Sequence, residues 1–348
     1  MLTQLLGTGL PIIQAPMAGV QDATLAAAVC NAGGLGSLPC AMLSPEDLQR
    51  EIARLKGLTD RPFNLNFFCH TPVDPTAQQL AQWKITLMDY FRELGVEPPE
   101  SHPGPAREPF GEETLAIVES VNPAVVSFHF GLPGPDWVER IKSRGSRILS
   151  TATTVEEAVW LADNGADAII AQGLEAGGHR GSFLSEDMNA QSGTLSLLPQ
   201  VCEKVSVPVI AAGGIAGPQG VAAAIALGAA GVQVGTAFLL CPEALTSPLH
   251  RAALSRTGAG QTALTNVFTG RPARSIVNRL VREIGPMARA VPPFPAAAAL
   301  VSALRRAAEP AGNPDFTPLW CGQNASGCSD ISAVEILRRL AEGLPAGC

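Results

Sequence analysis

The sequence is poor in charge and has no basic block. Only 16% of its 348 residues are charged, and acidic residues outnumber basic ones by 31 to 24, which gives a net charge of -7. A protein that binds nucleic acid needs basic side chains to neutralise phosphates, so we expect no nucleic-acid partner. The hydrophobic fraction of 46% is enough for a large core and argues against disorder.

The sequence also lacks the signals of export, membrane insertion and metal binding. No basic region opens the N-terminus, which predicts no secretory signal and a cytoplasmic protein. The longest uncharged stretch, between Lys204 and Glu243, is interrupted by glycines and Pro218, so it predicts strands and a helix rather than a membrane span. The eight cysteines include no C-x-x-C pair, so we expect reduced thiols and no metal.

What the sequence does contain is an alternation of short apolar runs with Ala- and Leu-rich helical stretches. The apolar runs show no polar alternation, which is typical of parallel strands covered on both faces. Eight strands are predicted, at residues 11–17, 35–38, 63–68, 125–130, 147–151, 168–172, 208–212 and 231–238. Helices are predicted between most of them, at residues 24–32, 45–56, 135–143, 155–164, 195–203 and 217–227.

Eight such units in about 240 residues match an α/β fold of the (β/α)8 TIM-barrel type. The competing architecture, a doubly wound sheet, usually carries a G-x-G-x-x-G turn after its first strand, and Pro16-Met17-Ala18-Gly19 does not supply one. We therefore expect a cofactor-binding barrel over residues 1–240. Residues 69–112, after the third strand, predict a lid-like insertion with one amphipathic helix at 77–94. Residues 241–348 predict a mostly helical segment that covers the barrel mouth, with helices at 296–308 and 332–342.

Glycines close the last two predicted strands. Ala211-Ala212-Gly213-Gly214-Ile215 ends the seventh strand, and Gly235-Thr236 ends the eighth. Many barrels bind phosphate at the loops after strands seven and eight, where glycine lets backbone N–H groups approach the ligand. These positions therefore predict a phosphate site.

A glycine-dense loop follows the sixth strand, Gly173-Leu174-Glu175-Ala176-Gly177-Gly178-His179-Arg180-Gly181. An imidazole at the catalytic face of a barrel can act as acid or base near neutral pH, so His179 is the candidate catalytic residue. Arg180 is interpreted either as a partner for an anion or as a solvent-facing side chain.

Uncharged side chains stand at the ends of other strands. The amides of Asn66 and Gln172 and the residues Ala15-Pro16-Met17 suit the edge of a flat heterocycle. Met17 fits equally well as an ordinary core residue. His129, near the end of the fourth strand, points either into the mouth, as a substrate-pocket residue, or into the packing layer.

Six ordered motifs together resemble the nitronate monooxygenases, formerly called 2-nitropropane dioxygenases. The similarity covers nearly the whole chain and is strongest over residues 8–68 and 121–243. The motifs are Pro11-Ile12-Ile13-Gln14-Ala15-Pro16-Met17-Ala18-Gly19, Asn31-Ala32-Gly33-Gly34-Leu35-Gly36, Pro62-Phe63-Asn64-Leu65-Asn66, Glu175-Ala176-Gly177-Gly178-His179-Arg180-Gly181, Ala211-Ala212-Gly213-Gly214-Ile215 and Gln233-Val234-Gly235-Thr236-Ala237-Phe238.

The resemblance implies an FMN-dependent oxidoreductase that oxidises alkyl nitronates with O2 to a carbonyl compound and nitrite. It places the catalytic residue at His179. The phosphate-binding positions it implies are Gly213, Gly214, Gly235 and Thr236; the other cofactor-binding positions are Ala15, Pro16, Met17, Asn66, Gln172, Gly177 and Gln233. The partners it implies are the small-molecule substrate and O2, and the oligomeric state stays open.

The sequence departs from the family pattern near its C-terminus. Members most like it carry Tyr and Lys side chains in the helix over the mouth, whereas residues 294–302 contain neither, and the only tyrosine of the chain is Tyr90. We expect a roomier, more apolar pocket, with Phe294 in its wall. Two alternatives stay open: an FMN-dependent enoyl-acyl-carrier-protein reductase that uses NAD(P)H, which shares a similar His loop, and a non-catalytic module that binds a phosphorylated ligand.

Overall fold

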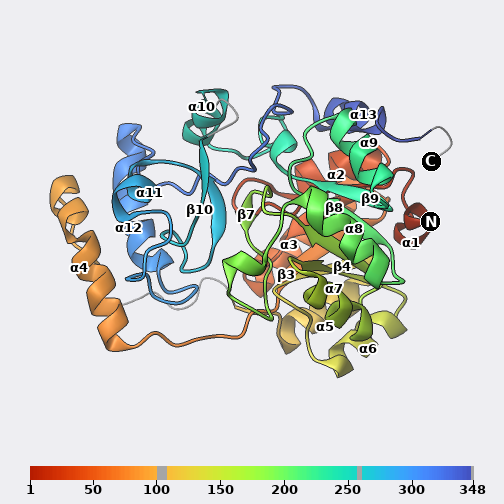
Figure 1. The fold of residues 1–348 in the computed structure, drawn as a ribbon, viewed down its shortest axis with the longest axis horizontal. Helices are drawn as coiled ribbons and strands as arrows, with labels where there is room; N and C mark the ends of the chain where they lie inside the picture. The colour runs from red at the N-terminus through yellow and green to blue at the C-terminus, as the bar shows by residue number, and fades with distance from the viewer. Residues whose placement is uncertain (100–107, 257–260, 346–348) are drawn as a thin grey trace.

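A computed structural model describes residues 1–99, 108–256 and 261–345. Eight parallel strands form one sheet in the order β1-β9-β8-β6-β5-β4-β3-β2, and a bridge between Ile13 and Leu35 joins its two edges. The fold is therefore a (β/α)8 TIM barrel, as predicted (Figure 1). The strands are β1 (Ile12–Gln14), β2 (Gly36–Pro39), β3 (Phe63–Phe68), β4 (Val125–His129), β5 (Arg147–Ala152), β6 (Ala168–Gln172), β8 (Val209–Ala212) and β9 (Gly231–Val234).

Helices between the strands form the outer layer, close to where the sequence predicted them. They are α2 (Ala23–Asn31), α3 (Pro45–Leu58), α6 (Pro135–Ser143), α7 (Val155–Asp163), α8 (Thr194–Lys204) and α9 (Pro218–Ala226), with α13 (Ala333–Ala341) packed against α2 and α9. Helix α3 begins as its sequence indicates, because the Ser44 hydroxyl accepts from the N–H of Asp47 and Pro45 occupies the first turn. The eighth predicted strand is shorter than expected. It ends at Val234, and residues 236–238 form the 3-10 helix η2 (Thr236–Phe238).

A short helix that the sequence analysis did not predict, α1 (Leu2–Leu6), closes one end of the barrel. Its Leu2 and Leu6 are buried in one cluster with the side chains of Ile13, Leu35 and other strand residues. Burial of a leucine side chain contributes about 1.5–3 kcal/mol, so this contact stabilises the barrel substantially. The opposite end, where the strands have their carboxyl ends, is left for the ligand.

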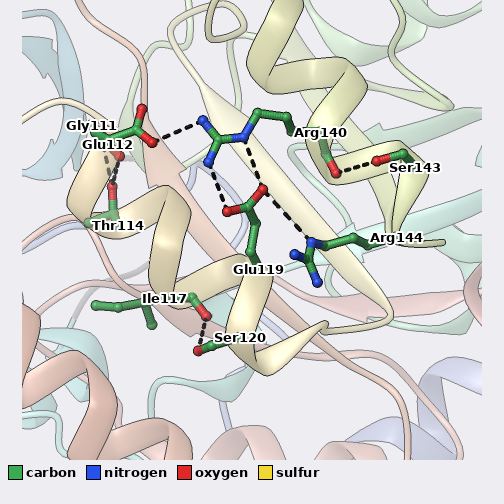
Figure 2. Close-up of polar contacts among 9 residues, drawn as sticks. All are labelled: Gly111, Glu112, Thr114, Ile117, Glu119, Ser120, Arg140, Ser143 and Arg144. Carbon is green, nitrogen blue, oxygen red and sulfur yellow. Dashed lines mark hydrogen bonds and ion pairs between the residues drawn. The ribbon is translucent and has the colours of Figure 1, made fainter.

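Helix α5 (Glu112–Val121), also not predicted, lies beside α6 in the outer layer. Figure 2 shows Arg140 bound to both Glu112 and Glu119, and Arg144 reaching the same Glu119 carboxylate. The side chain of Arg140 is 40% exposed. Exposed ion pairs contribute about 0–1 kcal/mol each, so this network adds little to the stability of the fold. It connects helix α5 to helix α6.

The segment after the barrel is not only helical. It contains α10 (Pro248–Arg256), β10 (Thr262–Thr265), β11 (Ala273–Ile276), α11 (Arg279–Ile284), α12 (Ala298–Ala308) and the 3-10 helix η3 (Glu309–Ala311). Strands β10 and β11 form an antiparallel sheet with β7 (Gly178–His179), which belongs to the glycine-dense loop of the barrel. This sheet, which the sequence analysis missed, ties the C-terminal segment to the candidate catalytic residue.

The predicted insertion contains helix α4 (Ala77–Leu94), which lies along α12 at one end of the molecule (Figure 1). Trp83 is fully buried there and donates from its indole N–H to the carbonyl of Ala297. The insertion therefore packs on the C-terminal segment. That residues 69–112 and 241–348 cover the barrel mouth stays a prediction, and parts of both, residues 100–107, 257–260 and 346–348, lie outside the described residues. In the described part of the chain, no helix has the length and apolar character needed to cross a membrane.

Candidate active site

A cavity opens at the carboxyl ends of the barrel strands. It encloses about 1430 Å3 of space, part of which is open to solvent. Its wall contains the residues that the sequence analysis proposed for the cofactor, which come from five strand ends and the glycine-dense loop: Ala15, Pro16, Met17, Asn66, Gln172, Gly177, Gly213, Gly214, Gln233, Gly235 and Thr236. His129 and His179 line the same cavity. The fold thus brings residues more than 200 positions apart in the sequence into one site.

The ends of β8 and β9 present backbone N–H groups to this cavity. Gly213 and Gly214 have φ angles of 111° and 73°, which strongly favour glycine. Within residues 1–99, 108–256 and 261–345, the N–H groups of Gly213, Gly214 and Gly235 donate no hydrogen bond. These glycines are partly exposed and line the cavity, so an anion bound there could accept from their N–H groups.

The cavity wall around these glycines has no basic side chain among the described residues. The one carboxylate in the described part of the wall, Glu175, is held by the N–H and hydroxyl of Thr194 at the start of α8. Thr236 accepts a hydrogen bond from the N–H of Gly322 at 3.0 Å. A phosphate bound here would depend on backbone N–H groups and the Thr236 hydroxyl rather than on a cation.

The turn after β1 is fixed by Gln21, a buried residue of the following segment. Its side-chain oxygen accepts from the N–H of Met17 at 2.8 Å, and its amide nitrogen donates to the carbonyl of Ser37 at 2.6 Å. The backbone of Ala15, Pro16 and Met17 is therefore held rigidly along the cavity wall, where a flat ring could lie against it.

Two amide side chains on the cavity wall differ in whether they have a hydrogen-bond partner. Asn66 donates to the hydroxyl of Ser127 at 2.9 Å. The side-chain oxygen of Gln233 is buried and has no hydrogen-bond partner among the described residues. An unpaired buried acceptor costs about 1–3 kcal/mol, so Gln233 fits a ligand that offers a donor at this point.

The loop that carries His179 is held by side chains at both ends. Gln172 donates to the carbonyl of His179 at 3.0 Å and accepts from the N–H of Gly181 at 2.9 Å. Arg180 is fully buried, and its guanidinium donates to the carbonyls of Gln172 and Gly173 and to the side chain of Gln191. Burial lowers the pKa of Arg180 to about 9. Both interpretations of Arg180 from the sequence differ from this geometry, because its side chain neither faces solvent nor reaches the cavity.

The imidazole of His179 stands among aromatic rings. The ring centroids of Trp320 and Phe294 lie 5.4 and 5.5 Å from its own, and Phe68 and Phe130 lie slightly farther. Its Nε2 is 2.9 Å from the hydroxyl of Thr269. Phe294, proposed for the substrate pocket, is buried and is not among the residues that line the cavity.

His129 has both ring nitrogens engaged. Its Nε2 is 3.2 Å from the carbonyl of His179, which can only accept, so Nε2 carries the hydrogen and Nδ1 accepts from the hydroxyl of Thr151 at 3.1 Å. Burial lowers the pKa of His129 to about 3, so the ring is neutral at physiological pH. The structure thus places His129 where it supports the backbone of His179.

Several wall residues come from sequence positions that carried no clear motif. Trp320, Gly322 and Asn324, from the segment after the barrel, also line the cavity, and Asn324 donates to the carbonyl of Gly214. His250 also lines the cavity, and burial lowers its pKa to about 4. The sequence analysis assigned no role to these residues, because Cys321-Gly322-Gln323-Asn324 matches none of its motifs.

Comparison with known proteins identifies the family. The family model described as nitronate monooxygenase matches residues 1–343. The nitronate monooxygenase of Pseudomonas aeruginosa is 44% identical over 98% of both chains. The structure of nitroalkane oxidase from Streptomyces ansochromogenes has 42% identity and a TM-score of 0.90, covering 99% of this chain and 97% of that one. A mutant of FabK from Thermotoga maritima is more distant, with 28% identity and a TM-score of 0.74 over 98% and 94% of the two chains.

Proposed function

Because the chain belongs to the nitronate monooxygenase family and is therefore an oxidoreductase, we propose that it uses FMN and O2 to convert alkyl nitronates to a carbonyl compound and nitrite. The observation that carries the proposal is the position of His179. His179 lines the same cavity as Gly213, Gly214 and Gly235, whose N–H groups have no acceptor among the described residues. A phosphate-anchored cofactor would thus share one cavity with a side chain able to bind and deprotonate a substrate.

The described residues fit FMN on chemical grounds. Gly213, Gly214, Gly235 and Thr236 would hold its phosphate through N–H and hydroxyl donors. The unpaired oxygen of Gln233 would accept from a donor group of the cofactor. The remaining proposed contacts, to the flat ring, are Ala15, Pro16, Met17, Asn66, Gln172 and Gly177. When bound, FMN would supply the electron transfer and the reaction with O2.

His179 would act on the substrate in one of two ways. A nitronate is an anion whose charge lies on the nitro oxygens, and a hydrogen bond from the imidazole would hold those oxygens. A neutral nitroalkane must first lose its α-proton, which the imidazole would accept as general base. His129 and His250 would be weak bases, because burial keeps the pKa of each far below 7.

The apolar rings around His179 suit a substrate with an apolar body. Phe68 and Trp320 line the cavity next to the imidazole, and residues 294–302 supply no Tyr or Lys. Apolar contact of this kind would hold the alkyl chain and exclude water from the reacting atoms.

The test of the proposed reaction is an anaerobic reduction of the purified, FMN-loaded protein. Propyl nitronate should bleach the flavin absorbance, and readmitted O2 should restore it with release of nitrite. Fast bleaching by NADH, with none by the nitronate, would instead support the enoyl-acyl-carrier-protein reductase alternative. A colourless protein that takes up no FMN on reconstitution would contradict both.

The role of His179 is tested by His179→Asn. We expect this variant to keep its FMN and to lose about a hundredfold or more of its turnover on neutral nitroalkanes, since general-base catalysis contributes about 10²–10⁴-fold. Turnover of preformed nitronates should fall much less, because no proton has to be removed. Equal losses on both substrates would mean that His179 is not the base.

A further inference from the structure

Residues 322–324, which we name the clasp, bind both turns of the proposed phosphate site. The N–H of Gly322 donates to the hydroxyl of Thr236, in the turn after β9, at 3.0 Å. The side-chain amide of Asn324 donates to the carbonyl of Gly214, in the turn after β8, at 3.0 Å. The partners of these two bonds are 86 and 110 residues apart in the sequence. The clasp therefore links two strand ends of the barrel from a distant part of the chain.

The clasp lies directly against the barrel. The N–H of Gln323 donates to the carbonyl of Glu175 at 2.9 Å, which ties the clasp to the glycine-dense loop as well. A Cβ at Gly327, a few residues later, would lie 1.9 Å from the carbonyl oxygen of Ala216. The backbone on both sides of Asn324 is thus in close contact with the barrel, and the position of this side chain is fixed.

The orientation of the Asn324 amide is determined by its neighbours. Its side-chain oxygen accepts from the N–H of Ser326 at 3.2 Å and from the Ser326 hydroxyl at 2.7 Å. A backbone N–H can only donate, and the carbonyl of Gly214 can only accept, so the amide nitrogen must face Gly214. In the described part of the chain, no other hydrogen bond to this carbonyl is formed. Asn324 is therefore the residue that holds the Gly214 carbonyl.

The turn after β8 needs such support because it is made of glycines. Gly213 and Gly214 have φ angles of 111° and 73°. Glycine adopts many other backbone conformations at similar energy, so two in succession do not by themselves keep their N–H groups in one direction. Fixing a backbone costs conformational entropy, and a ligand that has to order the turn is bound more weakly for that reason. A turn already held by Asn324 would bind a phosphate without this loss.

We propose that Asn324 is a positioning residue for the cofactor, which holds the turn after β8 in the conformation that binds the phosphate of FMN. The inference rests on the proposed cofactor and not on the reaction that the enzyme catalyses. Gly322 acts in the same sense at the turn after β9. Its N–H occupies an acceptor position of the Thr236 hydroxyl, so the hydroxyl hydrogen is left for a different acceptor.

The experiment compares the binding of FMN and of riboflavin, which differ only in the phosphate. Both dissociation constants are measured by the quenching of flavin fluorescence as deflavinated full-length protein is added. Asn324→Leu keeps a similar side-chain size but removes the donor. We expect it to raise the Kd of FMN by about threefold to tenfold, the effect of one hydrogen bond. The Kd of riboflavin should change by about twofold or less, because riboflavin has no phosphate for the turn to bind.

Ser326→Ala provides a milder version of the same test. Ser326 is exposed, so its replacement should not disturb folding, but it removes the hydroxyl that holds the oxygen of Asn324. We expect FMN to bind about twofold to threefold more weakly, with riboflavin binding unchanged. In both variants the 31P signal of bound FMN should shift from its wild-type position, a change that a loss of overall stability would not produce.

The matched control is Asn266→Leu. The Asn266 amide also bridges backbone groups, since it donates to the carbonyl of Ala288 at 3.0 Å and accepts from the N–H of Ala288 at 2.9 Å. Asn266 is not among the residues that line the cavity. Its replacement should leave the ratio of the two dissociation constants at the wild-type value, whatever its effect on stability.

Two results would overturn the inference: equal weakening of FMN and riboflavin binding in Asn324→Leu, or unchanged FMN binding in this variant. Wild-type protein that binds FMN no more tightly than riboflavin would overturn the phosphate site and this inference together. Wild-type protein that binds FMN but oxidises no nitronate would refute the proposed reaction alone. The binding measurements need no turnover, so in that case the inference would stand.

Discussion

Replacement of Arg180 tests whether its side chain stabilises the fold or attracts an anionic substrate. Its guanidinium is fully buried and donates three hydrogen bonds, of 2.6, 2.7 and 2.7 Å, to Gly173, Gln172 and Gln191. In Arg180→Met the acceptors on Gln172 and Gln191 lose this partner, whereas the carbonyl of Gly173 still accepts from the N–H of Ala176. An unpaired buried polar group costs about 1–3 kcal/mol, which sets a gross loss of about 2–6 kcal/mol. Part of it is offset because the variant no longer buries a cation. We expect the free energy of unfolding to fall by about 2 kcal/mol or more.

The assay is urea-induced unfolding followed by far-UV circular dichroism, with KM for propyl nitronate measured in parallel. Arg180→Lys is the discriminating variant, since it keeps the charge but not the planar fork that reaches three acceptors. We expect it to be destabilised nearly as much as Arg180→Met. Arg50→Met, at an exposed position whose side chain pairs with Asp47, should change stability by about 0.5 kcal/mol or less. The reasoning is refuted if Arg180→Met unfolds at the wild-type urea concentration and shows only a raised KM.

Three further predictions concern the cofactor site and the acid range. Gly235→Asp should expel FMN by placing a carboxylate beside the phosphate, and an unchanged flavin content per protein would contradict the phosphate site. Gly177→Ala should lower FMN occupancy and stability, because its Cβ would lie 2.6 Å from the N–H nitrogen of Gly322. A Cβ at the neighbouring Gly178 meets nothing within 4 Å, so Gly178→Ala should cost only about 1–2 kcal/mol of backbone strain. Urea unfolding measures the loss of stability of both variants. The pKa of His129 is about 3 when folded and near 6.5 when unfolded, so its contribution to stability is complete above pH 6.5 and falls progressively between pH 6.5 and 3. At pH 5 the loss should be about 2 kcal/mol, and His129→Gln should reduce this dependence in urea titrations across that range.

The barrel and most of the cavity wall could be predicted from the sequence because their signals are local. Each strand and helix carries its own apolar pattern, and glycines at strand ends such as Gly213 mark the turns that need them. The order of units along the chain then fixes which strand ends meet. That is why residues as distant as Ala15 and Gly235 could be assigned to one site before the structure was considered.

The structural features that the sequence analysis did not predict depend on contacts between segments that are distant in the sequence. Strand β7 is two residues long, and its partner β11 begins at Ala273, so no local pattern reveals the pairing. Thr269 is one of many threonines, and only the fold places its hydroxyl at the ring of His179. Arg180 is a further example. A cation beside a candidate base suggests substrate binding, and only the structure shows that its side chain is buried.

The pairing of β7 with β11 has a consequence for protein engineering. The barrel alone supplies most of the cavity wall proposed to hold FMN, whereas Thr269, Phe294 and Trp320, which surround the imidazole of His179, all belong to the segment after residue 240. A chimaera that joins this barrel to the corresponding segment of a relative, with Asn324 kept, would exchange the surroundings of the base and leave the glycine turns of β8 and β9 intact. Grafts of this kind should therefore alter which nitro compounds are accepted while the protein stays yellow.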